Sequence, residues 1–431
     1  MGVTLTWWAA LLGLALAIIL ILKKLNTTYA LMLGAVVGCL IGGANFPQTV
    51  KIIVAGSQSV MGTVVRVLAA GVLAGVMMES GAANRIAKTI VTVFGEKLAI
   101  FSLAFATMII CAVGVFIPVA VLIVAPIAIE VGTRLHFSKL ALLVALSGGG
   151  KAGNIISPNP NTVAVAEGFK VPIASVMINS FIPALFGLAV AVLLASLLQH
   201  RGTPVSMADL GETSDDSEPA QLPSIGASLV APIVAIVLLL INPIGSVLGI
   251  GFMKAFQVDA MYILPLAAII GLLAMGQGKH ILQYTKAGLN RMVDVVLILI
   301  GAGALGGLIT NSDLPDQIVN LIKMTGISGS FLAPIAGILM AAAAASTSTG
   351  VILGSSAFGS TILGFGVSPV AAAVTMQAGA TVIDSLPHGN YFHVTGKSMN
   401  MSLAERMKVL PYEALVGLTM TVVSSVMYLV F

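Results

Sequence analysis

Apolar segments long enough to cross a lipid bilayer follow one another along most of this chain, separated by short polar connections. A helix needs about 17–25 predominantly apolar residues to span the hydrocarbon core. Hydrophobic residues make up 58% of the 431 positions and charged residues only 8%, whereas soluble domains carry roughly 25% charged residues. The sequence therefore predicts an all-α polytopic membrane protein and argues against a soluble enzyme.

Ten apolar segments are expected to cross the membrane. These are 4–22, 28–45, 62–79, 139–168, 174–198, 225–243, 261–276, 292–310, 368–393 and 411–431. Two further apolar segments, 98–129 and 330–365, are too long for one helix, and each has a soft centre rich in glycine, proline, serine or threonine. We expect each of these two to form a re-entrant hairpin of two half-helices. The polar segment 199–224 is the only candidate linker.

A polar run at 147–162 interrupts one of the expected crossings. The three glycines Gly148–Gly150, followed by Pro158 and Pro160, do not permit a continuous helix. A second break falls at 377–390, inside another expected crossing. Irregular backbone at membrane depth is tolerated only where protein or water satisfies its polar groups. We therefore expect both breaks to line a cavity.

The two halves of the chain, 1–198 and 225–431, resemble each other at an offset of 232 residues, which places Ala70–Gly75 on Ala302–Gly307. The same offset superimposes the centres of the two expected hairpins, and a small further shift superimposes the two breaks. Each half has five expected crossings, an odd number, so the two repeats must be inverted. Inverted repeats with interrupted helices in equivalent positions are typical of secondary transporters with a binding site at the membrane midplane.

Polar side chains at the breaks and at the second hairpin tip are the candidate binding residues. Helix N-termini and freed backbone amides favour an anion, and hydroxyl and amide side chains bind hydroxyls as well as carboxylates. The expected substrate is therefore a small hydroxylated carboxylate. The candidate substrate-binding residues are Lys151, Asn154, Ser157, Asn159, Asn161, Thr162, Ser346, Thr347, Ser348, Thr349 and Asn390.

Lys151 is the one cation inside the first break, and Asp384 and His388 are the other ionisable residues within a break. Lys151 either binds the substrate carboxylate or forms a structural ion pair, with Asp384 as its candidate partner. Asp384 and His388 are candidates for ion coupling, because a carboxylate beside a lysine and a histidine both titrate in an accessible range. Coupling to Na⁺ is the alternative, because amide, hydroxyl and carbonyl oxygens of broken helices also hold that ion.

Other classes of function find little support. Gly148–Lys151 is followed by Ala152 rather than Ser or Thr, so it is not a phosphate-binding loop. No metal-ligand cluster, cofactor motif or catalytic constellation is present, and the net charge of +4 comes without a basic run that would bind nucleic acid. Cys39 and Cys111 lie in apolar stretches and imply no disulfide. A passive channel or facilitator remains the alternative from a different class.

Lysine and arginine are unevenly divided between the two sides of the expected topology. Most of them fall on the side opposite the termini, whereas the terminal side holds only Lys51, Arg66, Lys170, Lys254 and Lys323. By the positive-inside rule the termini face outward and the linker at 199–224 is cytoplasmic. This orientation fits a bacterial inner-membrane protein.

The run Pro158-Asn159-Pro160-Asn161-Thr162, followed by Ala164, Ala166 and Glu167, is similar to the gluconate permease (gluconate:proton symporter) family of the ion-transporter superfamily. The segment Gly75–Ala83 and the order of hairpins and broken helices also resemble that family. The resemblance implies proton symport of sugar acids or related hydroxy or amino acids. It also implies a homodimer in which a transport domain moves against a scaffold as an elevator.

Overall fold

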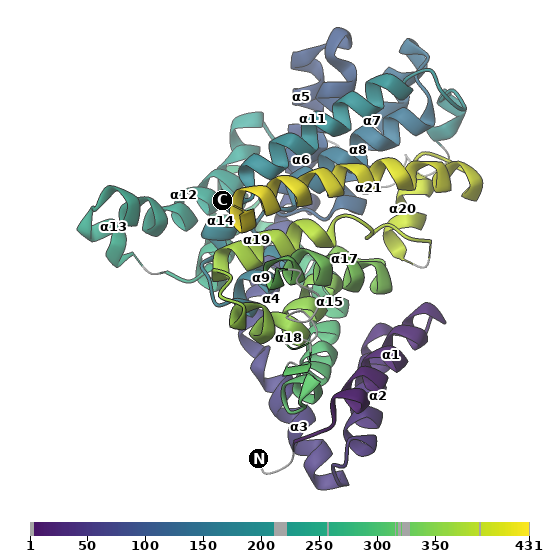
Figure 1. Ribbon diagram of the computed structural model, residues 1–431. Coiled ribbons are helices and arrows are strands. Elements are labelled where there is room, and N and C mark those ends of the chain that lie inside the picture. The colour runs from purple at the N-terminus through teal and green to yellow at the C-terminus, as the bar shows by residue number, and fades with distance from the viewer. Residues whose placement is uncertain are drawn as a thin grey trace.

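The computed structural model describes residues 4–430 except 211–221, 257, 315, 318–319, 321–327 and 388. Almost every described residue in a regular element is helical, and the described residues form only two isolated β-bridges, Leu5 with Ser312 and Ser138 with Pro204 (Figure 1). The α-helices are α1 (Trp7–Leu22), α2 (Thr27–Ile41), α3 (Phe46–Ser59), α4 (Met61–Glu79), α5 (Ala82–Phe94), α6 (Ala99–Ala112), α7 (Ile117–Leu135), α8 (Lys139–Asn154), α9 (Pro160–Gly168), α10 (Ile173–Asn179), α11 (Phe181–Leu198), α12 (Ile225–Leu248), α13 (Gly251–Ala255), α14 (Ala260–Ala274), α15 (Ile281–Thr310), α17 (Leu332–Ala344), α18 (Thr347–Gly364), α19 (Pro369–Ala380), α20 (Asn390–Ser398) and α21 (Leu403–Ser425).

The helices confirm a multi-pass membrane architecture. Six described helices are long and apolar enough to cross a membrane, or seven if α5 and the segment Glu96–Ala112, bent by 105°, are taken as one span. The other apolar helices are shorter, and four of them, such as α2 and α14, have 10–17 residues. The expected count of ten crossings relies on these shorter helices and on broken pairs, so that count stays a prediction.

Several expected segment boundaries differ from the helices. The expected crossing 28–45 ends early because Asn45 starts α3, where it forms a reciprocal capping box with Gln48. The expected crossing 174–198 is two helices, α10 and α11, which meet at Ser180. Pro183, in the first turn of α11, has no N–H to donate to a preceding turn.

Two helices begin earlier than the hydropathy pattern indicates. The helix expected at 292–310 starts at Ile281, and the helix expected at 411–431 starts at Leu403. Ser402 caps the second of these, again in a capping box with Glu405. The first turns of these two helices are rich in polar residues, and a hydropathy pattern does not include them in the span. Hydropathy alone therefore places the start of each helix too late.

Each long apolar segment folds as two helices joined by a tight turn. Gly114, with φ of +106°, lies between α6 and α7, and Ala345, with φ of +46°, lies between α17 and α18. Breaks of five and nine residues separate α8 from α9 and α19 from α20, respectively. Helix α7 packs against α20, and α18 packs against α9, so each hairpin contacts the broken helix of the other half.

Two groups of helices are recognisable in the fold. In Figure 1, α1–α3 occupy the lower part of the view, α5, α7, α8 and α11 lie at the top, and α21 runs across the middle. The first group is centred on α4 and α15, which contact each other; α2 and α3 pack against α15, and α14 packs against α4. The second group consists of helices that contact one another in series, namely α6, α8, α11, α21, α19 and α17. Helices α9 and α18 pack against α19 of the second group. Because α9 also contacts α4 and α18 also contacts α15, these two helices join the groups.

Glycines allow very close helix approach within the first group. A Cβ on Gly56 of α3 would lie 2.3 Å from the Gly303 carbonyl oxygen of α15. A Cβ on Gly288 of α15 would lie 2.2 Å from the Gly71 carbonyl oxygen of α4. The offset of 232 residues maps Gly56 onto Gly288 and Gly71 onto Gly303. The contact between Gly56 and Gly303 in one half therefore corresponds to the contact between Gly288 and Gly71 in the other.

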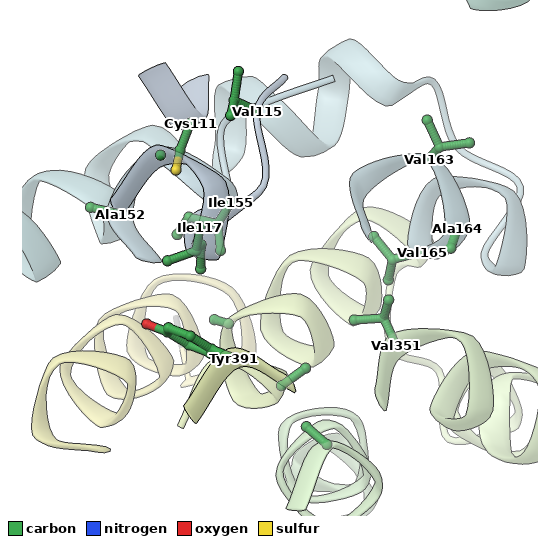
Figure 2. Packing of buried hydrophobic residues seen from close by; sticks show 14 of the residues in the cluster. Cys111, Val115, Ile117, Ala152, Ile155, Val163, Ala164, Val165, Val351 and Tyr391 are labelled. Atoms are coloured by element: carbon green, nitrogen blue, oxygen red, sulfur yellow. The ribbon is translucent and has the colours of Figure 1, made fainter. Parts of the chain in front are cut away.

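The second group is built around an apolar core beneath the first hairpin tip. Figure 2 shows Cys111, Val115, Ile117, Ala152 and Ile155 gathered there. Both cysteines of the chain are buried and free. This core fixes the end of α8 against the hairpin α6–α7, which positions the first break.

Candidate functional site

The site is an open cavity of about 490 Å³, and the first turns of four helices contribute to its lining. We call it the central cavity. Its lining residues are Thr27, Phe116, Ile117, Pro118, Val119, Asn154, Asn161, Arg291, Val295, Ile298, Ala344, Ala345, Ser346, Thr347, Ser348, Thr349, Ile352, Gly389, Asn390 and Tyr391. Lining residues come from both hairpin tips, from both broken helices and from α15, so the cavity lies where the two halves of the chain meet.

The N-termini of α7, α9, α18 and α20 all contribute to this cavity. The N-cap residues of α7 and α20 are Phe116 and Gly389, and neither provides a side-chain hydrogen bond to its helix. Asn159 and Ser346 do cap α9 and α18. A helix N-terminus carries partial positive charge and unsatisfied amides, so four of them make the cavity favourable for an anion.

The polar side chains of the cavity leave hydrogen-bonding capacity for a ligand. Ser348 donates to Asn161 Oδ1, which joins the second hairpin tip to α9. Asn154 Nδ2 and the Tyr391 hydroxyl are buried without a hydrogen-bond partner. Figure 2 shows Tyr391 of α20 close to Ile117 of α7. Buried polar groups without partners are costly, and a polar ligand in the cavity would relieve that cost.

Lys151 and Asp384 lie behind the cavity wall and form an ion pair. The distance from Lys151 Nζ to Asp384 Oδ1 is 2.6 Å, and both side chains are fully buried. Lys151 also donates to the Thr381 carbonyl. Thr347 Oγ1 donates to Asp384 Oδ2 at 2.5 Å, so a residue that lines the cavity touches the pair. The sequence left two roles open for Lys151, binding of the substrate carboxylate and a structural ion pair. The structure shows the ion pair, with Asp384 as its partner.

Asn159 organises the first break. Its Nδ2 donates to the backbone carbonyl and to Oδ1 of Asn154, at 2.8 and 2.6 Å. Its Oδ1 accepts from the backbone N–H groups of Asn161 and Thr162, at 2.9 and 3.1 Å. Both its amide nitrogen and its amide oxygen hold the loop and the start of α9. Asn159 therefore positions cavity-lining residues without lining the cavity itself.

The structure divides the candidate residues predicted from the sequence into two sets. Those that line the central cavity are Asn154, Asn161, Ser346, Thr347, Ser348, Thr349 and Asn390. Those that are buried and absent from its lining are Lys151, Ser157, Asn159, Thr162 and Asp384. Thr162 accepts from Gln377 Nε2 at 2.8 Å, which joins α9 to α19. His388 lies outside the described residues.

A second buried ion pair, between Arg406 and Glu413, was not predicted. Two hydrogen bonds of 3.0 Å join the guanidinium to the carboxylate, and Ser385 donates to Glu413 at 2.7 Å. Arg406 also lies 4.8 Å from the centroid of the Phe392 ring. These contacts tie α21 to the second break and to α20. A signal was present in the sequence, because opposite charges seven residues apart share one helix face.

Arg291 is the cation on the central cavity wall, and it was also not predicted. Its Nη2 lies 2.6 Å from Glu79 Oε1 at the end of α4. Among the described residues, no group of three or more His, Cys, Asp or Glu side chains is arranged to hold a metal ion.

Comparisons with known proteins agree with this architecture. The family model described as "GntP family permease" matches residues 5–431. An uncharacterized transporter of Haemophilus influenzae is 46% identical over 422 residues and 98% of each chain. The gluconate permease of Bacillus subtilis is 27% identical, over 79% of this chain and 82% of that protein. The D-serine transporter DsdX of Escherichia coli K12 is 24% identical, over 87% and 88% of the two chains.

Two solved transporter structures share the fold at low sequence identity. The Alcanivorax borkumensis YdaH transporter has a TM-score of 0.63 and 15% identity over 97% of this chain and 98% of that one. Neisseria gonorrhoeae MtrF has a TM-score of 0.67 and 14% identity, over 96% and 95%. Because the family model covers almost the whole chain and the relatives are permeases rather than enzymes, the protein belongs to the GntP family of permeases and is a membrane transporter.

Proposed function

We propose that this protein imports a small hydroxylated organic anion, such as a sugar acid or a hydroxy or amino carboxylate, by proton symport. The observation that carries the proposal is the convergence of four helix N-termini on one cavity of about 490 Å³. Arg291, which is paired with Glu79, also lies on its wall, and no Asp or Glu is among the described residues that line it. The cavity therefore has the electrostatic character of an anion site.

The size and chemistry of the cavity support a small polar ligand. Ligand sites are commonly about 300–1,000 Å³ in volume, and the central cavity falls within that range. The hydroxyls of Ser346–Thr349 and the amides of Asn154, Asn161 and Asn390 suit a substrate that carries hydroxyl or amino groups beside its carboxylate. Gluconate and D-serine, the substrates named for two relatives, both have a carboxylate and at least one hydroxyl.

Alternating access by an elevator movement is part of the proposal. The exchange of the Gly56–Gly303 and Gly71–Gly288 contacts at an offset of 232 supports two inverted repeats, 1–198 and 225–431, joined by the linker 199–224. The broken helices and hairpin tips contribute the binding groups, so they would form the moving part, and α4 with α15 would belong to the scaffold. A homodimer follows from the resemblance to the gluconate permeases.

The proposed orientation places both termini outside a bacterial inner membrane. The central cavity then opens toward the cytoplasm, because Thr27 and Arg291 line it and both lie on the side richer in lysine and arginine. Lys170 and Asn311 would lie on the outer side.

Transport into proteoliposomes tests the proposal. Labelled gluconate, other sugar acids and D-serine are offered with a pH gradient, a sodium gradient or neither. Accumulation driven by the pH gradient alone is expected for at least one of these anions. Accumulation driven by the sodium gradient alone would show that the coupling ion is Na⁺ rather than a proton. Equilibration without accumulation would indicate a passive facilitator.

A substitution inside the central cavity connects the transport to the site. Asn161→Asp should weaken transport of the same anion, because it adds a negative charge to the cavity while keeping the shape of the side chain. Unchanged transport kinetics in this variant would show that the anion binds elsewhere.

A further inference from the structure

Arg291 is the one cation among the residues that line the central cavity. It belongs to α15, the long helix that packs against α4 and α18 (Figure 1). Val295 and Ile298 continue the same wall of the cavity along α15. The Arg291 side chain is 40% exposed, so water and a ligand both reach it. A cation and four helix N-termini therefore line one cavity.

The guanidinium of Arg291 has unused hydrogen-bond donors. A guanidinium carries five N–H donors in a planar fork. Its Nη2 donates to Glu79 Oε1 at 2.6 Å, and Arg291 makes no other side-chain hydrogen bond with the described residues. Nε and Nη1 are therefore available to a ligand. Two parallel N–H groups of an arginine match the two oxygens of a carboxylate.

Two other arginines of the chain are occupied by their partners. Arg66 donates three hydrogen bonds to Asp259 and contacts a second carboxylate. Arg406 is 1% exposed and donates two hydrogen bonds to Glu413. Neither of them lines the central cavity. Arg291 thus differs from both, because it combines free donors with access to the site.

Glu79 competes with an anion for the same guanidinium. It is the last residue of α4, its side chain is 30% exposed, and it does not line the central cavity. Ion pairs that water reaches are weak, so Glu79 does not hold Arg291 firmly. Two carboxylates beside one guanidinium also repel each other. Glu79 therefore lowers the affinity of Arg291 for a substrate carboxylate.

The place of Arg291 in the fold makes its contact with the anion depend on the state of the transporter. Helix α15 belongs to the proposed scaffold, whereas the hairpin tips and broken helices would move along it. Between Met292 and Thr310, α15 carries no lysine or arginine. Its far end lines a different cavity, of about 420 Å³, with Gly303, Gly306 and Gly307. Binding groups that move toward that end leave the cation behind.

The helix packing shows on which side the moving elements stand. The offset of 232 residues maps α7 onto α18, α9 onto α20 and α4 onto α15. Helix α18 packs against α15 and α9 packs against α4. The corresponding pairs, α7 with α4 and α20 with α15, are described in full and show no comparable packing. The central cavity separates α15 from the first turns of α7 and α20, so in this state the site lies beside Arg291.

We propose that Arg291 binds the substrate carboxylate only in the cytoplasm-facing state, and that Glu79 is the competing carboxylate that promotes its release. The assignment rests on the anion import proposed above. The substrate carboxylate accepts hydrogen bonds from Nε and Nη1 of Arg291 while the site faces the cytoplasm. When the anion leaves, Glu79 is again the only carboxylate on the guanidinium. Substitutions of this pair therefore change the affinity at one face of the membrane and not at the other.

Counterflow exchange in oriented membrane vesicles tests this sidedness. Inverted and right-side-out vesicles are prepared from cells that make the full-length protein, and the KM for a labelled anion is measured on each outer face. Arg291→Gln should raise the KM at the cytoplasmic face about tenfold and change that at the external face by less than about twofold, because a hydrogen-bonded charge is lost at one face only.

Glu79→Gln should have the opposite effect. Without the competing carboxylate, the KM at the cytoplasmic face should fall about threefold, as expected for a partly exposed ion pair. Net import should become slower, because the anion leaves Arg291 less readily. In the Arg291→Gln background, Glu79→Gln should not change the KM further, since it acts through the guanidinium.

Asp294→Asn is the matched control for charge alone. Asp294 lies three residues beyond Arg291 on α15 and lines a neighbouring cavity of about 480 Å³ rather than the central one. It forms no ion pair with a described residue. Its removal takes the same charge from the same region without freeing a donor of Arg291, so the KM should change by less than about twofold at either face.

The possible results separate the proposals. A wild-type KM in Arg291→Gln, or an equal rise at both faces, would overturn the assignment of Arg291. A higher KM in Glu79→Gln would show that Glu79 positions the guanidinium rather than competes for it. If Arg291→Gln does not fold, Arg291→Lys decides, because it keeps the charge but loses the planar fork and should still raise the cytoplasmic KM. Absence of exchange by the wild type with every anion would instead remove the proposed function itself.

Discussion

Lys151 and Asp384 stand 233 residues apart in sequence, yet they form a fully buried ion pair with 2.6 Å between Nζ and Oδ1. The pair joins the last turn of α8 to the segment between α19 and α20, and thus one broken helix to the other. A charge left alone in such a place costs several kcal/mol. The pair therefore holds the two halves of the site in register.

Lys151→Ala should abolish anion transport and also lower stability. The sequence alone predicted loss of transport with the fold intact, but removing one partner of a buried pair typically costs about 3–5 kcal/mol. Melting of the detergent-purified protein measures the second effect. The double variant Lys151→Met with Asp384→Leu should recover part of the lost stability without recovering transport. Wild-type uptake by Lys151→Ala would refute a role for the pair in shaping the site.

Asp384→Asn separates a structural role from the coupling role predicted from the sequence. Asn keeps the shape of Asp384 and an acceptor for Thr347, but it leaves the Lys151 ammonium without a counter-charge. We expect net uptake and counterflow to fall together, because both need an assembled site. A selective loss of gradient-driven uptake would support coupling through Asp384.

Asn161→Asp should raise the KM for an anionic substrate about tenfold, which corresponds to roughly 1.4 kcal/mol of lost binding. The new carboxylate keeps the Oδ1 that accepts from Ser348. Asn161 is only 2% exposed, so the desolvation cost of the new carboxylate opposes its favourable position in the first turn of α9, and the melting temperature is measured beside the KM. Concentration-dependent uptake measures the KM. Ser348→Ala is the comparison variant, because it removes the hydrogen bond that Asn161→Asp keeps and adds no charge, and it should have the smaller effect.

Gly56→Ala and Gly288→Ala should destabilise the protein to a similar extent. Each new Cβ would meet a carbonyl oxygen of a neighbouring helix, at 2.3 and 2.2 Å respectively. Overpacking of this kind typically costs about 1–3 kcal/mol. Gly226→Ala is the control, because a Cβ there meets nothing within 4 Å. A large difference between the first two variants would weaken the equivalence of the two repeats.

Removing the ion pair between Asp209 and Lys139 should have a pH-dependent cost. Burial acts to raise the pKa of Asp209, but hydrogen bonds from Lys139 and Ser206 outweigh it and lower that pKa from 3.8. The ionised form is thus favoured in the folded state, so its stabilisation is present above the unfolded pKa and is lost as the pH falls through the folded one. Asp209→Asn should therefore melt lower than wild type at pH 6, and the difference should shrink as the pH falls below 3.8. A pH-independent difference would contradict the linkage.

The sequence by itself determined the class of this protein and the parts of its site. Long apolar segments with few charges are typical of a bilayer protein, and a polar run rich in glycine and proline predicts an interrupted helix, so the multi-pass fold and a break within 147–162 follow from local chemistry. The break itself is shorter than predicted, because α8 continues through Gly148–Gly150 to Asn154 and α9 begins at Pro160. The polar residues of the second hairpin tip, Ser346–Thr349, were identifiable for the same reason. These signals are short-range and require no knowledge of which segments meet.

Only the tertiary structure decided which polar residues face the cavity and which support it. Asn159 and Asn161 are two positions apart in one motif, yet one holds the loop and the other lines the site. The partners of Lys151, Arg66 and Arg406 also depend on helix packing between distant segments. A charge in a membrane protein needs a partner, but its identity follows from long-range geometry that the pattern of residues along the chain does not contain.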